Sequence, residues 1–224
     1  MSPRAPSGII QLRRLVSERF PGVRTWAEEA PASFPARRPT GLPGLDALLQ
    51  GGLAQNAITE VAAQGHGAGS ALFLHALLRQ THRAGQWMGL IDGQDSFDPG
   101  ALPQAVLSRL FWVRCHGAEE ALKAADILLR DRNLPLMALD LKMNPPAQLR
   151  KISGTTWYRL QRIVRQTGTA LVVLTPHPMI AGAGTRLMLE SRLNLADLPE
   201  SGEKLAAELK FELVRPAAAE SAAG

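Results

Sequence analysis

The chain has 224 residues, of which 46% are hydrophobic, and a formal net charge of +5. This length and composition allow one good-sized core, so we expect one main domain with appendages. No window approaches the roughly 18–20 apolar residues of a membrane span, and the N-terminus lacks the apolar segment of a secretion signal. The single Cys115 excludes an internal disulfide, so a reducing cytoplasm is the expected compartment.

The positive charge is concentrated at the N-terminus. Residues 1–39 contain seven arginines and three acidic residues, a balance of +4. Ser7 is placed to cap a short amphipathic helix, and the prolines that follow, up to Pro39, predict a linker. If the chain binds DNA or another polyanion, this basic arm, with Arg13 and Arg14, is the first candidate. A solvated leader is the alternative.

From Thr40 onward, apolar strand patterns alternate with helical patterns, which predicts a mostly parallel sheet flanked by helices. The expected strands are 58–62, 87–92, 110–115, 136–141 and 170–175. The expected helices are 42–49, 70–84, 99–107, 118–130 and 156–167. Two alternating segments, 186–195 and 204–214, predict an antiparallel pair joined by a turn at 199–202. The core domain is thus expected over 40–215, followed by a disordered tail at 216–224.

A glycine-rich loop lies between the strand expected at 58–62 and the helix that follows it. Its glycines are Gly65, Gly67 and Gly69. Ser70 begins the helix, which gives the order of a phosphate-binding loop. In such loops, backbone N–H groups surround the phosphates, and a lysine before a Ser or Thr neutralises them. Here glycine stands at position 69, so the sequence keeps the architecture of the loop without its main positive charge.

Five segments in this order resemble the RecA-type ATPase core, and together they cover most of 40–215. They are TGLPGLDALLQGGLAQNAITEV, WMGLIDGQDSFDP, LPLMALDL, TALVVLTPH and GAGTRLMLESRLNL. The resemblance implies a RecA-like α/β fold with antiparallel C-terminal strands. It also places Gln94 at the position of the catalytic glutamate and Asp140 at that of the magnesium-associated aspartate.

The catalytic positions implied by this resemblance have all changed. Besides the missing lysine, Gln94 is an amide that cannot take a proton at neutral pH. Pro176 stands where a glutamine that senses the γ-phosphate is expected. We therefore expect no ATP hydrolysis and no cofactor. Because Ser70 and Asp140 remain in metal-binding places, weak nucleotide binding stays open as an alternative.

Among RecA-like proteins with a degenerate site, the chain most resembles the ImuA family of SOS mutagenesis proteins. The features are LDALLQGGL, the lysine-free GHGAGS loop, LFWVRC followed by GAEEALKAAD, and WYRLQRIVRQTGTALVVL followed by Thr-Pro. The resemblance implies a role in translesion DNA synthesis beside an ImuB-like Y-family protein and an error-prone DnaE-type polymerase. RecA, DNA and a second copy of the chain are the further candidate partners. Two alternatives remain: a SulA-type inhibitor of FtsZ assembly, and a divergent ATP-binding switch.

Two sets of residues are candidates for binding DNA or a protein partner. The DNA candidates beyond the arm are Arg150 and Lys151, expected in a loop at 141–155, and Arg159, Arg162 and Arg165 on one helix side. A solvated helix face is the alternative for the three arginines, and Trp157, Tyr158 and Leu160 are expected to pack.

The protein-docking candidates follow from the way RecA-type proteins polymerise, by pairing near the strand that matches 110–115. They are Leu110, Phe111, Val113, Cys115, Lys123 and Arg130. For Cys115 the alternative is a buried core thiol. The five histidines form no metal signature.

Overall fold

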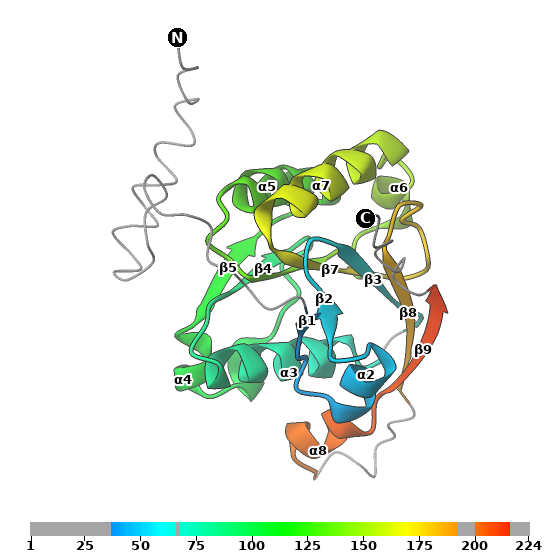
Figure 1. The fold of residues 1–224 in the computed structure, drawn as a ribbon. Coiled ribbons are helices and arrows are strands. Elements are labelled where there is room, and N and C mark those ends of the chain that lie inside the picture. Colours follow the sequence, from blue (N-terminus) through cyan, green and yellow to red (C-terminus); the bar gives the residue numbers. More distant parts are fainter. Residues whose placement is uncertain (1–36, 66–67, 192–199, 216–224) are drawn as a thin grey trace, which may run out of the picture.

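The computed structural model describes residues 37–65, 68–191 and 200–215 (Figure 1). Its central feature is a seven-stranded sheet in which every neighbouring pair is parallel except the last, which is antiparallel. The α/β prediction, with antiparallel strands at the C-terminal end, is confirmed. In spatial order the strands are β5 (Leu110–Arg114), β4 (Met88–Asp92), β6 (Leu136–Asp140), β7 (Ala170–Thr175), β3 (Ile58–Ala63), β8 (Thr185–Glu190) and β9 (Lys210–Arg215).

Helices cover both faces of this sheet, as Figure 1 shows. The α3 layer consists of α2 (Pro43–Leu48), α3 (Ser70–Arg83), α4 (Gln104–Leu107) and α8 (Gly202–Ala207). The α5 layer consists of α5 (Ala118–Arg130), α6 (Pro146–Leu149) and α7 (Gly154–Thr167). Every residue of β3, β4, β6 and β7 is buried, because helices cover these mostly apolar strands on both faces.

The described fold begins slightly before Thr40. Residues Arg37–Arg38 form β1, which pairs antiparallel with β2 (Leu53–Ala54). The Asp46 carboxylate fixes the next turn, since it accepts hydrogen bonds from the backbone N–H and the hydroxyl of Thr40, both at 2.8 Å. Part of the segment expected as linker is therefore already paired.

Three predicted elements differ in detail from those observed. The helix expected at 99–107 is broken into a 3₁₀ turn, η1 (Pro99–Ala101), and the short α4, because Pro103 between them has no N–H to donate. Helix α7 begins at Gly154 rather than 156, since the Ser153 hydroxyl caps it by accepting from the Thr156 N–H. The expected loop at 141–155 contains α6.

The C-terminal pair also differs from the prediction. The segment expected to begin a strand at 204 is instead helical, because the Ser201 side chain accepts from the Lys204 N–H and caps α8. The last strand therefore starts at Lys210. The first strand of the pair ends at Glu190, and residues 192–199 lie outside the described residues.

Several predictions fall on residues that the structure does not describe. These are the N-terminal helix and most of its linker, Arg13, Arg14, Gly67 and the tail. Within the described ranges, no helix is long and apolar enough to cross a bilayer.

Candidate functional site

The candidate site lies where the carboxyl ends of β3, β4 and β6 meet at one edge of the sheet, the usual ligand side of a parallel sheet. The loop after β3 leads into α3, which begins at Ser70. Asp92 and Asp140 end β4 and β6 and are partners in the strand register. Ser70, Gln94 and Asp140 thus lie at or after the carboxyl ends of strands at the same edge of the sheet.

The glycine loop adopts backbone conformations that favour glycine. Gly65 and Gly69 have φ angles of +75° and +84°. The first helical hydrogen bond of α3 runs from the Phe73 N–H to the Gly69 carbonyl at 2.9 Å. A Cβ at position 69 would overlap Cδ2 of Leu209 and lie 3.3 Å from Cβ of Ser191. Any side chain at position 69 would therefore need both this positive φ and a shift of the Leu209 side chain.

A lysine that the sequence analysis missed lies at this loop. Lys142 Nζ donates a hydrogen bond to Ser70 Oγ at 3.2 Å, although the two residues are 72 positions apart in the chain. The Lys142 backbone N–H also donates to Asp140 Oδ1 at 2.9 Å. This tight turn at the end of β6 sends the lysine side chain to the start of α3. The loop lacks a lysine in sequence, and the turn after β6, two strands away from β3, brings Lys142 to Ser70.

The Asp140 carboxyl and the Lys142 ammonium shift each other's pKa. Burial raises the pKa of Asp140 to about 6, while the Lys142 backbone N–H and ammonium lower it. The pKa of Lys142 is lowered by burial, and the Asp140 charge opposes that shift. Both groups carry a desolvation cost, and each is the counter-charge of the other.

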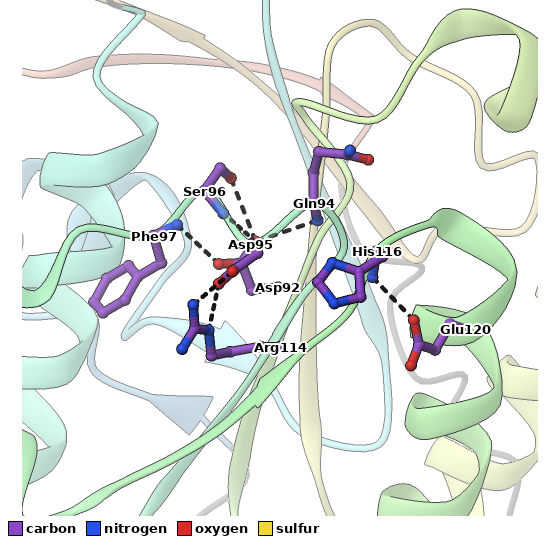
Figure 2. A network of polar contacts seen from close by, with 8 residues as sticks. All are labelled: Asp92, Gln94, Asp95, Ser96, Phe97, Arg114, His116 and Glu120. Carbon is purple, nitrogen blue, oxygen red and sulfur yellow. Dashed lines mark hydrogen bonds and ion pairs between the residues drawn. The ribbon is translucent and has the colours of Figure 1, made fainter.

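The loop that carries Gln94 is fixed by the buried carboxylate of Asp92 (Figure 2). Asp92 accepts hydrogen bonds from the backbone N–H groups of Ser96 at 3.0 Å and Phe97 at 2.8 Å. It also accepts from the Gln94 N–H at 3.4 Å and from the Ser96 hydroxyl at 3.3 Å. These four donors satisfy the carboxylate, so Asp92 holds the loop and is not free to act as a base.

The side chain of Gln94 is held by the turn after β6. Asn144 Nδ2 donates to Gln94 Oε1 at 3.3 Å, and also to the Gly93 carbonyl at 2.9 Å and Gln148 Oε1 at 3.1 Å. Asn144 is buried, while Gln94 is exposed. An amide in this position can orient a neighbour but cannot accept a proton at neutral pH.

On the other side of β3, a buried ion pair that the sequence analysis missed anchors the β7–β8 loop. Glu60 is fully buried, and its Oε1 accepts from the backbone N–H groups of Met179 at 2.6 Å and Ile180 at 3.0 Å. Its Oε2 accepts from Arg186 Nε at 2.7 Å. The only sequence signal was an acidic residue inside an otherwise apolar strand.

The docking candidates are divided by the structure between core and surface. Leu110 and Cys115 are 7% and 1% exposed, so their side chains belong to the core and are not available to a partner. Burial raises the pKa of the Cys115 thiol to about 11, as for a core thiol. Phe111 and Val113 are half-buried against the α5 layer.

The two charged docking candidates on α5 are exposed and already ion-paired. Lys123 pairs with Glu119 at 2.7 Å and Arg130 with Asp126 at 3.0 Å. Beside Lys123 there is a cavity of about 660 Å³, whose walls include His116, Glu119, Glu120, Gln148 and Lys151. It lies between the start of α5 and the α6–α7 turn, next to the end of β5.

The DNA candidates within the described chain are all exposed. Arg150 and Lys151 follow α6, and Arg159, Arg162 and Arg165 lie along the outside of α7. Arg159 is held by Asp126 at 3.1 Å. Trp157 is buried, as expected, but Tyr158 is 62% exposed, so the prediction that it packs is wrong. Successive residues of an α-helix are turned by about 100°, so Tyr158 falls outside the face that buries Trp157.

Comparison with models of known protein families finds no match, and comparison with curated proteins finds none either. Among the described residues there is no group of three or more His, Cys, Asp or Glu side chains able to hold a metal ion.

Proposed function

We propose that this chain is a catalytically silent RecA-like adaptor in SOS mutagenesis. It supports error-prone translesion synthesis by binding an ImuB-like Y-family protein and thereby a DnaE-type polymerase. The family part of this proposal rests on the five RecA-like segments and the ImuA-like motifs of the sequence. The mostly parallel sheet, with its glycine loop between β3 and α3, agrees with that assignment.

The geometry at Gly69 is the observation that supports the proposed absence of catalysis. A lysine at that position would overlap Leu209, so the charge that polarises the phosphates cannot be regained there without repacking. The base position is held by Gln94, whose amide bonds to Asn144. Electrostatic stabilisation and a positioned base are the two main catalytic contributions in phosphoryl transfer, and both are missing from their expected positions.

Calorimetric titration with ATP and ADP in magnesium, followed by a phosphate-release assay on the same sample, tests this part. We expect no turnover, and no binding tighter than about 100 μM, roughly −5.5 kcal/mol. Tighter binding would favour the ATP-binding switch over the adaptor.

The outer edge of β5 supports the partner-binding part of the proposal. Among the described strands, β5 pairs with β4 alone. The Cys115 N–H donates to Asp92 O at 2.8 Å, and the Met88 N–H donates to Arg109 O at 3.0 Å. Alternate residues of a parallel strand bond to the same neighbour, so the Arg114 N–H points away from β4. A strand of the ImuB-like partner can add here.

Arg114→Pro tests strand addition, because proline removes this outward N–H and edge strands tolerate it. Arg114→Ala is the matched control, since it loses the ion pair to Asp95 and the contact with the Trp112 ring but keeps the N–H. We expect Arg114→Pro to abolish binding to the ImuB-like protein, while Arg114→Ala binds it. Equal binding by both variants contradicts the edge as the docking site.

Two further measurements separate the remaining roles. Loss of salt-sensitive DNA binding in the double variant Arg162→Glu, Arg165→Glu would assign DNA contact to the outside of α7. Inhibition of FtsZ sedimentation by the purified protein would favour the SulA-type division inhibitor instead.

A further inference from the structure

The RecA resemblance implies a magnesium ion at Ser70, and the residues present do not fit one. In a working phosphate loop, the Ser or Thr hydroxyl binds Mg²⁺ and an acid from a neighbouring strand faces the ion. Here Ser70 Oγ already faces the ammonium of Lys142 at 3.2 Å. A divalent cation on the same hydroxyl would lie within a few ångströms of a like charge, which is strongly unfavourable in a half-buried site.

The local backbone holds Lys142 in this arrangement. The hydrogen bond from its own N–H to Asp140 Oδ1 closes the turn after β6 and directs the side chain toward α3. Asp140 is 9% exposed and lacks the second carboxylate of a metal cluster, because the neighbouring Asp92 is fully engaged with the 94–97 loop. The Lys142 ammonium therefore stabilises the Asp140 carboxylate, and the carboxylate in turn stabilises the protonated lysine.

The glycine loop is also closed from the side of the C-terminal segment. Leu209 packs beside Gly69, and it is part of the hydrophobic cluster under the α3 layer. The start of α3 is thus held by an apolar contact at Gly69 and by the lysine at Ser70. Neither contact requires a ligand.

We propose that the Lys142 ammonium is a built-in replacement for the magnesium ion of the nucleotide site. It links the start of α3 to the end of β6, so that the adaptor core keeps its shape without metal or nucleotide. This inference rests on the proposed function, since it takes Ser70 and Asp140 as the metal-side positions.

Manganese binding, followed by the electron paramagnetic resonance signal of free Mn²⁺, tests the proposal. Lys142→Met removes the charge and keeps an apolar stem, and Lys142→Gln is a second neutral variant that still offers Ser70 a hydrogen bond. Lys210→Met, at an exposed lysine of β9, is the matched control. We expect both Lys142 variants to bind Mn²⁺ at least about tenfold more tightly than the wild type and the control. Adding Ser70→Ala to Lys142→Met should remove the gain.

Other results would overturn the proposal. Equal Mn²⁺ binding by the wild type and both neutral variants would show that the lysine does not replace the ion. If the wild type bound Mg·ATP and the Lys142 variants lost it, Lys142 would be a phosphate ligand instead. Phosphate release by the wild type would contradict the silent adaptor itself, whatever the Mn²⁺ result. Phosphate release thus tests the silent adaptor and Mn²⁺ binding tests the role of Lys142, so each proposal can fail separately.

Discussion

Glu60 is an acidic residue that the fold removes completely from water. It has no exposed surface, and it holds Met179, Ile180 and Arg186. Breaking a buried ion pair leaves one charge uncompensated, which typically costs about 3–5 kcal/mol. We therefore expect Glu60→Ala to lower the free energy of unfolding by about 3 kcal/mol or more, measured by chemical denaturation.

A surface glutamate serves as the control for that measurement. Glu212→Ala, at an exposed position of β9, should change the free energy of unfolding by less than about 0.5 kcal/mol. If the two variants lose the same stability, the ion pair does not hold the β7–β8 loop.

Asp140 should give the stability a measurable pH dependence. Its pKa is about 6 in the folded protein because of burial, against an ordinary value of 3.8. Between these values, the folded state holds a proton that the unfolded state has lost. The contribution of Asp140 therefore favours folding at low pH and is lost as the pH rises from about 4 to about 6, by at most about 3 kcal/mol.

Comparison with Asp140→Asn isolates this contribution from those of other acids. The wild type should become steadily less stable relative to the variant across that pH window, as measured by denaturation at several pH values. If the difference in free energy of unfolding between the wild type and Asp140→Asn does not change with pH, the buried carboxyl keeps its ordinary pKa.

At the scale of elements, the start of α3 packs against the α8–β9 turn, where Leu209 lies beside Gly69. Gly69→Lys combines a positive φ with overlap on Leu209, so we expect it to lower the free energy of unfolding by about 2 kcal/mol or more. Leu209→Ala should be destabilising by itself, because it removes packing from the core.

The double variant Gly69→Lys, Leu209→Ala shows whether the loss of stability in Gly69→Lys comes from overlap with the Leu209 side chain. With Leu209 truncated, the lysine gains space, so the two losses should sum to more than the loss of the double variant, measured as a double-mutant cycle. Additive losses would indicate that backbone strain alone excludes a side chain at position 69.

For the whole molecule, the position of each strand in the sheet should set its local stability. β3, β6 and β7 lie inside the sheet and are buried throughout, whereas β5 and β9 are its outer described strands. We expect the amides of β3, β6 and β7 to exchange with solvent most slowly, close to the rate of global unfolding, and those of β5 and β9 faster. Hydrogen exchange followed by mass spectrometry measures this. Equal protection of β5 would contradict its role as an open edge.

The sequence by itself determined the order and type of the main elements. Apolar runs such as 170–175 and amphipathic helices such as α5 carry their signal locally, and their predicted bounds agree closely with those observed. The segments at 99–107 and 204–209 were harder to predict, because single residues, Pro103 and Ser201, decide where those helices begin and end.

The candidate site was predicted only in part, for a physical reason. Ser70 was identified from the glycine loop before a helix, and Gln94 and Asp140 from the resemblance of their segments to the RecA core. The contacts of Lys142 with Ser70, of Glu60 with Arg186 and of Leu209 with Gly69 join residues distant in the chain. No local pattern encodes such contacts, because they arise only when neighbouring strands pair in register and the C-terminal segment packs against α3. The sequence determined that glycine, not lysine, precedes Ser70, and only the tertiary structure decided that Lys142 reaches Ser70 and that Leu209 lies beside Gly69.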